Sequence, residues 1–310
     1  MGKWTADDLP DQTGRTILIT GANSGLGLRS AEALAAKGAR VLLACRNAER
    51  AATALEAVKA KATGPAPEVR TLDLQSLASV RTCAAEVAAE LESLDVLMNN
   101  AGIMAVPKAT TADGFESQLG TNHLGHYALT GLLLPTLLAA REPRVVTVSS
   151  NAHNLGRMDF SDLFFERRRY SRWRAYGQSK LANLLFTSEL QRQAVEHHTA
   201  LTAVAAHPGY AATNLTSGPA IGMAFVRPVL AAADKIIGQP DHMGALPQLY
   251  AATMPDVMAD DYWGPDAFRE QRGYPTRVDR TKHAQSTTDA RRLWELSEEL
   301  TGVSYPWPPR

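Results

Sequence analysis

The sequence predicts an α/β protein built on a doubly wound parallel sheet. Short apolar segments rich in β-branched residues alternate with longer helical segments over residues 15–209. The apolar segments are hydrophobic at successive positions, which is typical of strands buried on both faces. Parallel strands need crossover connections, so helices should cover both sides in a three-layer α/β/α arrangement of the Rossmann type.

Six segments have the length and composition of buried strands, and polar residues or glycine follow each of them closely. The strands are expected at 15–20, 41–45, 68–72, 95–100, 144–150 and 201–209. The helices are expected at 25–37, 47–62, 76–91, 114–140 and 174–195. Gly38 is positioned to end the first helix, Gly64 to break the second and Ser76 to cap the third. No linker rich in Gly, Ser or Pro divides the chain, so we expect a single domain over residues 1–310.

The composition excludes several classes of protein. The 310 residues include 32 basic and 32 acidic side chains, and zero net charge argues against a nucleic-acid-binding protein that works through a positive field. Two cysteines are too few for a disulfide scaffold or a four-cysteine zinc site. His123, His126 and His207 lack nearby acidic or cysteine partners, so no metal site is expected.

No segment resembles an export signal or a membrane anchor. The chain begins with three aspartates in its first eleven residues, where a signal peptide would need an apolar run. The apolar stretch at 132–140 is far shorter than the ~18 residues that indicate a spanning helix. We therefore expect a cytoplasmic protein without a transmembrane anchor.

A glycine-rich turn, TGANSGLG, joins the first predicted strand to the first predicted helix. Gly21, Gly25 and Gly27 follow the spacing G-x-x-x-G-x-G. Glycines there let the backbone approach a pyrophosphate, and the helix N-terminus offers free N–H groups to that anion. The spacing differs from the G-x-G-x-x-G fingerprint, and such a turn can also be purely structural.

The end of the second predicted strand bears on the choice of dinucleotide. NAD sites usually carry an acidic residue there to hold the ribose hydroxyls, but the sequence Ala44-Cys45-Arg46-Asn47 has none. The guanidinium of Arg46 has the planar geometry to bind a 2′-phosphate. A solvated surface arginine is the alternative, and we expect NADP(H) in preference to NAD(H).

Tyr176 and Lys180 lie four residues apart and therefore share one face of the predicted helix 174–195. An ammonium beside the phenol is expected to lower the tyrosine pKa, so that the phenol exchanges a proton with a carbonyl or alcohol oxygen near neutral pH. The spacing alone also occurs by chance. Ser149 and Ser150 end a strand at the edge where ligands of such folds bind, and Asn122 lies in the helical region before it.

Together these motifs resemble the short-chain dehydrogenase/reductase family over residues 14–215. The resemblance rests on TGANSGLG (20–27), Asp73-Leu74, NNAG (99–102), Asn122, the serine at 149–150, YGQSK (176–180) and His207-Pro208-Gly209. ACRN (44–47), TNHLGHYALT (121–130), YGQSKLANLLFTSEL (176–190) and RRLWELSEELTG (291–302) are similar to its retinol-dehydrogenase-like branch. The resemblance implies a cofactor and catalytic frame at 14–214 and a substrate lid with a C-terminal extension at 215–310.

The resemblance also implies the residue roles. Its catalytic tetrad is Asn122, Ser150, Tyr176 and Lys180. Tyr176 would be the general acid in reduction, Ser150 would orient the carbonyl, Lys180 would bind the nicotinamide ribose, and Asn122 would hold a relay water. The family pattern selects Ser150 over Ser149, which spacing does not. The implied cofactor-binding residues, with Tyr176 and Lys180, are Gly21, Asn23, Ser24, Gly25, Leu26, Gly27, Arg46, Asp73, Leu74, Asn100, Ala101, Gly102, Pro208, Gly209 and Thr213.

The implied function is hydride transfer between NADP(H) and a carbonyl or alcohol. The apolar segment 215–237 matches the family's lid and predicts a hydrophobic aldehyde, ketone or retinoid-like alcohol, although a short packed helix is the alternative. The arginine-rich stretch 167–174 is expected to be a loop paired with nearby acids rather than an anion- or membrane-binding rim.

Two other functions stay open. A nucleotide-sugar epimerase also uses a Tyr-x-x-x-Lys pair, but its glycine spacing is usually G-x-x-G-x-x-G. A non-enzymatic dinucleotide-sensing protein typically loses the catalytic pair, which is present here. The sequence leaves the oligomeric state open, with a homo-oligomer among the alternatives.

Overall fold

The computed structural model describes residues 3–210 and 239–309. Within these residues an eight-stranded sheet has the order β3-β2-β1-β4-β5-β6-β7-β8. Its strands are β1 (Thr16–Thr20), β2 (Arg40–Cys45), β3 (Glu68–Thr71), β4 (Val96–Asn99), β5 (Arg144–Val148), β6 (Thr202–Ala206), β7 (Tyr262–Ala267) and β8 (Arg272–Arg277). All pairings are parallel except that of β7 with β8. The strand order reverses between β1 and β4, where such sheets bind ligands.

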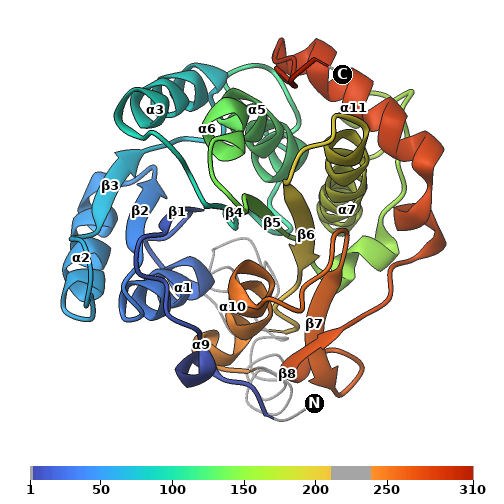
Figure 1. The fold of residues 1–310 in the computed structure, drawn as a ribbon. Coiled ribbons are helices and arrows are strands. Elements are labelled where there is room, and N and C mark those ends of the chain that lie inside the picture. Colours follow the sequence, from blue (N-terminus) through green and yellow to red (C-terminus); the bar gives the residue numbers. More distant parts are fainter. Residues whose placement is uncertain (1–2, 211–238, 310) are drawn as a thin grey trace.

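Helices cover both faces of this sheet (Figure 1). On one face lie α1 (Gly25–Ala35), α2 (Ala48–Lys59), α9 (Asp241–Gly244) and α10 (Leu246–Thr253), and on the other lie α3 (Leu77–Glu90), α5 (Gly125–Leu132) and α7 (Arg172–Glu196). Strand side chains alternate between the two layers: Ile17 and Ile19 pack with α1 and α2, and Leu18 packs with α3 and α5. The doubly wound α/β/α fold predicted from the sequence is confirmed.

The six predicted strands and their order along the chain are confirmed, but β7 and β8 were missed. Their sequences, YWGPDA and RGYPTR, contain glycine and proline, which argue against strands. β8 tolerates Pro275 because it lies at the sheet edge. Packing explains the glycine at position 264, since a Cβ there would lie 2.1 Å from Nε2 of the buried His207. α11 (Thr287–Thr301) completes the fold by packing against α7 (Figure 1).

The helical region predicted over 114–140 is present but is divided into several segments. This region contains α4 (Ser117–Leu119), a π-helix (Gly120–Leu124), α5 and α6 (Leu134–Leu138). Pro135 opens α6, because a proline lacks the N–H that would continue the preceding helix. The π-helix carries Asn122, and single π turns frequently mark functional sites.

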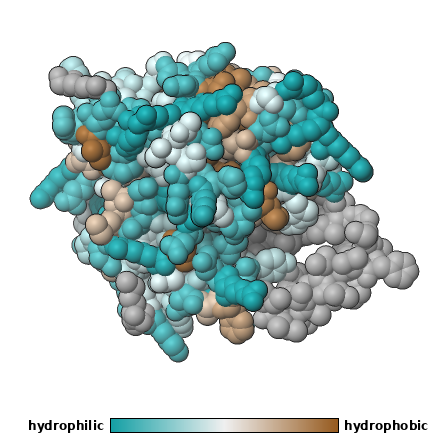
Figure 2. All heavy atoms as spheres, turned by 90° about the vertical axis from the view of Figure 1, so that its right-hand side faces the viewer, coloured by the Kyte–Doolittle hydropathy of each residue, from teal (hydrophilic) through white to brown (hydrophobic). Residues whose placement is uncertain are grey.

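The surface of the described residues is mostly polar. Figure 2 shows one face on which hydrophilic side chains predominate and hydrophobic ones lie apart. Large hydrophobic side chains that are exposed include Leu155, Trp173, Val195, Met258 and Phe268.

Every helix within 3–210 and 239–309 is too short or too polar to span a bilayer. The predicted lid at 215–237 and the cofactor residue Thr213 lie outside the described residues.

Candidate active site

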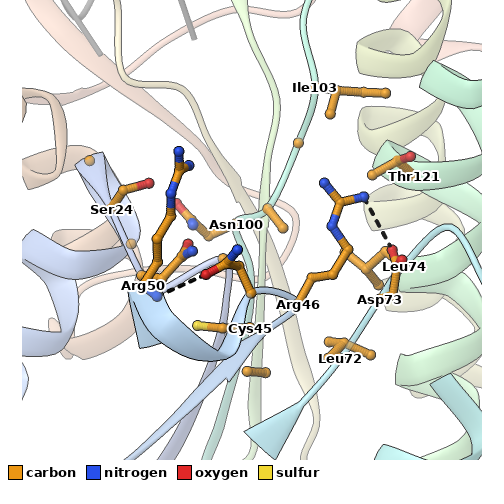
Figure 3. Close-up of a pocket in the computed structure, with 18 of the residues that line it drawn as sticks. Ser24, Cys45, Arg46, Arg50, Leu72, Asp73, Leu74, Asn100, Ile103 and Thr121 are labelled. Atoms are coloured by element: carbon orange, nitrogen blue, oxygen red, sulfur yellow. Dashed lines mark hydrogen bonds and ion pairs between the residues drawn. The ribbon is translucent and has the colours of Figure 1, made fainter. Parts of the chain in front are cut away.

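A cavity of about 530 Å³ opens at the carboxyl ends of β1, β2, β3 and β4, where the strand order reverses (Figure 3). Twelve of the predicted cofactor-binding residues line it. They are Gly21, Asn23, Ser24, Gly25, Leu26, Gly27, Arg46, Asp73, Leu74, Asn100, Ala101 and Gly102. Pro208 and Gly209 follow β6 at the same edge of the sheet but do not line this cavity.

The glycine turn leaves room for a ligand because its backbone occupies positions that side chains would block. Gly21 and Gly25 have φ of +69° and +51°, which favour glycine. A Cβ at Gly27 would lie 2.5 Å from the Gly21 carbonyl oxygen and 2.6 Å from Nδ2 of Asn100. Helix α1 begins at Gly25, inside the cavity lining, so its N-terminal turn faces the space. These features fit the pyrophosphate of a dinucleotide.

Two arginines stand at the β2 side of the cavity. Arg46 lies 3.7 Å from the Asp73 carboxylate and its side chain is 62% exposed. Arg50 also lines the cavity, and the sequence analysis missed it. Figure 3 shows the two side chains extending in the same direction, with a dashed line from Arg46 to Asp73. The sequence contains the residue that could have predicted this. Asn47 caps α2 by accepting from the Arg50 N–H, which places Arg50 in the first turn of that helix, close to Arg46.

Tyr176 and Lys180 lie one turn apart on α7, and both side chains are buried. The side chain of Ser150 interacts with the phenol of Tyr176 and lowers its pKa, against the effect of burial. The hydroxyl of Ser149 points to another partner, donating to the Lys180 backbone oxygen at 2.8 Å. The two serines therefore separate as strand alternation requires, and Ser150 is the one that reaches the tyrosine.

Burial sets the protonation of this pair. It raises the pKa of Tyr176 to about 12, against the opposing effect of the Ser150 hydrogen bond. Burial also lowers the pKa of Lys180 to about 8. The expected lowering of the tyrosine pKa is wrong for this structure: desolvation raises it, and the opposing contribution comes from Ser150 and not from Lys180. Nζ of Lys180 lies 5.8 Å from the Tyr176 ring centroid and donates to the Val148 carbonyl at 3.0 Å. The phenol is consequently protonated at neutral pH.

Asn122 connects the catalytic pair to the cavity. Its Nδ2 donates to the Ile103 carbonyl at 3.0 Å and to Oγ of Ser179 at 2.9 Å, and its Oδ1 accepts from the Ile103 N–H at 2.8 Å. Both N–H groups of this side chain are therefore already used, and neither is left to donate to the predicted relay water. Gly102 lies against both groups, since a Cβ there would be 3.2 Å from Oδ1 of Asn122 and 3.4 Å from Nζ of Lys180.

His207 and Arg168, which the sequence analysis singled out, have structural partners. The described part of the chain gathers no set of three His, Cys, Asp or Glu side chains suited to a metal ion. His207 accepts from the Gly209 N–H at 3.2 Å, which supports the turn after β6. Arg168 lies 3.5 Å from the carboxylates of both Asp159 and Asp162, as expected for a paired loop.

Comparison with known proteins decides the family. The family model described as short chain dehydrogenase matches residues 15–219. The chain belongs to the short-chain dehydrogenase family. It is 38% identical to human retinol dehydrogenase 13 over 296 residues, which cover 94% of this chain and 86% of that protein.

Solved structures share the fold. A crystal structure of an uncharacterized protein from Mycobacterium paratuberculosis is 46% identical, with a TM-score of 0.81 over 98% of this chain and 99% of that one. A short chain dehydrogenase from Shigella flexneri, complexed with NADP, shares the fold at 22% identity and a TM-score of 0.63, over 81% of this chain and 96% of its own.

Family membership makes this protein an oxidoreductase that acts on CH–OH groups and binds a nicotinamide dinucleotide. The retinol-dehydrogenase-like character predicted from the sequence is confirmed. The oxidoreductase function is therefore favoured over the epimerase that the Tyr-x-x-x-Lys pair left open.

Proposed function

We propose that this protein is an NADP(H)-dependent carbonyl reductase or alcohol dehydrogenase for apolar substrates. The observation that carries the proposal is the buried Tyr176 phenol, which interacts with Ser150 and lies one helical turn from Lys180. Lys180 in turn lies against Gly102, which lines the cavity. A buried, protonated phenol is the group that carbonyl reduction needs, because the new alkoxide must receive a proton.

The chain's residues supply positioning and proton transfer. The dinucleotide would be held by the glycine turn, by Arg46 and by the loop 100–103, and when bound it supplies the hydride. Tyr176 donates its proton to the substrate oxygen, and Ser150 shares the hydrogen bond that stabilises negative charge there. The Lys180 ammonium, held on the Val148 carbonyl, would place a positive charge one helical turn from the phenolate that remains. Asn122 fixes the loop that separates Lys180 from the cavity.

Arg46 should determine the preference for NADP(H). Replacing Arg46 with alanine removes the guanidinium that we propose binds the 2′-phosphate, a charge-assisted interaction worth about 1.5–3 kcal/mol. We expect the KM for NADPH to rise about tenfold or more, while the KM for NADH changes less than about twofold. Steady-state kinetics with both dinucleotides measures this difference.

Arg81→Ala is the matched control for Arg46. Arg81 donates to the Thr301 carbonyl at 2.8 Å and does not line the cavity. This variant should leave both KM values unchanged. If the KM values for NADPH and NADH rose equally in Arg46→Ala, a role for Arg46 in 2′-phosphate binding would be refuted.

The substrate is proposed to be a hydrophobic aldehyde, ketone or retinoid-like alcohol. Relatives named retinol dehydrogenases support this class. A local feature agrees: the Trp173 side chain is 53% exposed, and its ring meets the Tyr176 ring edge-on at 6.2 Å. We expect long-chain and ring aldehydes to give a higher kcat/KM than small polar aldehydes, measured by NADPH oxidation. A preference for the polar set would contradict the proposal. Cytoplasmic location stays a prediction of the sequence, and the oligomeric state stays open.

A further inference from the structure

His126 is a buried polar residue that the proposed mechanism does not use. It lies on α5, directly after the π-helix, and is 1% exposed. Its two ring nitrogens contact two separate parts of the site. Nδ1 lies 3.0 Å from the Asn122 carbonyl oxygen, and Nε2 lies 2.9 Å from Oγ1 of Thr20 at the end of β1.

The hydrogen-bond partners determine which nitrogen of His126 carries the proton. A carbonyl oxygen only accepts, so Nδ1 is the donor to it. Oγ1 of Thr20 already accepts from the N–H groups of Asn100 at 3.0 Å and Ala101 at 2.9 Å. The threonine proton is thus free to be donated, and Nε2 of His126 is nearer than the Met98 carbonyl at 3.3 Å. Burial lowers the pKa of His126 to about 4, so the ring is neutral at pH 7 and Nε2 accepts.

These bonds hold the loop 100–103 at both of its ends. Thr20 binds the amides of Asn100 and Ala101 at the beginning of the loop. The Asn122 side chain binds both backbone groups of Ile103 at its end. His126 is bonded to each of these two anchors, Thr20 through Nε2 and Asn122 through Nδ1.

The loop so held belongs to both halves of the site. All four of its residues line the dinucleotide cavity. Gly102, at its centre, lies against Nζ of Lys180. A change in the distance between the two anchors would shift the cavity wall relative to the catalytic lysine, because Gly102 alone separates the residues that the two anchors bind.

We propose that His126 is a positioning residue that sets the distance between Thr20 and Asn122 and thereby aligns the dinucleotide cavity with Tyr176 and Lys180. The inference rests on the proposed function, since it concerns the alignment of a bound dinucleotide with the proton donor. Its two hydrogen bonds predict two separable kinetic effects.

His126→Phe keeps a ring of similar size and removes both hydrogen bonds. We expect NADPH affinity, measured by fluorescence titration, to fall about tenfold and kcat for carbonyl reduction to fall about tenfold, each equivalent to about 1.4 kcal/mol. His126→Gln places an amide oxygen where Nε2 was and restores an acceptor for Thr20. This variant should recover NADPH affinity to within about twofold of wild type, while kcat stays reduced.

His123→Phe is the matched control. His123 is equally buried in the same π-helix region, but its Nε2 bonds to Oγ of Ser297 on α11, at 2.8 Å. This variant loses one buried hydrogen bond and should lose thermal stability, while kcat and NADPH affinity stay at wild-type values. The comparison separates positioning of the site from general destabilisation.

A second pair of variants tests the same proposal if His126→Phe does not fold. Thr20→Val keeps the side-chain shape without the hydroxyl and should weaken NADPH binding about tenfold. Thr20→Ser retains the hydroxyl and should bind NADPH within about twofold of wild type.

Three outcomes overturn the proposal. Folded His126→Phe or Thr20→Val protein with wild-type kcat and NADPH affinity would show that His126 does not position the site. Equal kinetic losses in His126→Phe and His123→Phe would show a purely structural role. Wild-type protein that neither binds NADPH nor reduces a carbonyl would instead refute the proposed function, and this inference with it.

Discussion

Replacing Tyr176 with phenylalanine is expected to lower kcat for carbonyl reduction by about 10²–10⁴-fold, because the variant lacks the proton donor. Tyr176 is 6% exposed and its phenol interacts with Ser150, so phenylalanine fills the same space without that hydroxyl. NADPH affinity should stay within about twofold of wild type, since the cavity lining contains other residues. Stopped-flow turnover and fluorescence titration measure the two quantities.

Tyr127→Phe is the control for this substitution. Tyr127 is a buried tyrosine on α5, and its hydroxyl has no hydrogen-bond partner among the described residues. Its removal should leave turnover unchanged. If Tyr176→Phe retained more than about a tenth of wild-type kcat, the assignment of Tyr176 as the acid would be wrong.

Lys180→Met is expected to lose activity and to gain stability. The ammonium of Lys180 is buried, and burial alone lowers its pKa to about 8, so the folded protein carries a charge at a desolvated position. Removing it leaves no unpaired acceptor, because the Val148 carbonyl also accepts from Nδ2 of Asn183 at 3.0 Å. We expect kcat to fall about 10²-fold or more and the free energy of unfolding to rise about 1 kcal/mol.

The pH dependence gives the Lys180 prediction a second readout. In the unfolded chain the pKa of the lysine keeps its ordinary value of 10.5, above its pKa of about 8 in the folded protein. Between these two pKa values the unfolded state binds more protons than the folded state. The free energy of unfolding of the wild type therefore rises with pH relative to that of Lys180→Met. The ionisation of Tyr176, whose pKa is raised to about 12 from 10.0, opposes the rise above pH 10 in both proteins. Carbonyl reduction by wild type should decline above about pH 8 as the ammonium is lost.

Thermal unfolding at pH 7, 8, 9 and 10 measures the stability difference, and a pH–rate profile measures the decline. Lys37→Met is the control, because its ammonium also donates to a backbone carbonyl, that of Asp7, at 2.8 Å on the exposed surface. It should change neither kcat nor the pH dependence of stability. A destabilised Lys180→Met with wild-type turnover would contradict the assigned role.

Features encoded by neighbouring residues could be predicted from the sequence. The apolar runs that became β1 to β6 are contiguous, and so is the glycine turn whose residues line the cavity. Arg46 was identified because it directly follows β2. The same reasoning could have reached Arg50, which the Asn47 cap places in the next helical turn.

Features that depend on contacts between distant segments could not be predicted. The break in the helix over 114–140 accompanies the bonds from Asn122 to Ile103, nineteen positions away. β7 contains Gly264 because it packs against the His207 ring, which no local pattern reveals. The spacing of Tyr176 and Lys180 indicated their proximity but not their burial, and burial decides the direction of the tyrosine pKa.

The central claim is hydride transfer from NADPH to an apolar carbonyl with Tyr176 as the proton donor. The most direct measurement uses NADPH carrying deuterium at the transferred position, with wild-type protein and a ring or long-chain aldehyde, followed by mass spectrometry of the alcohol. The account predicts that the alcohol carries one deuterium on the former carbonyl carbon and that Tyr176→Phe forms little of it. An alcohol without deuterium, or labelled alcohol formed equally well by Tyr176→Phe, would contradict it.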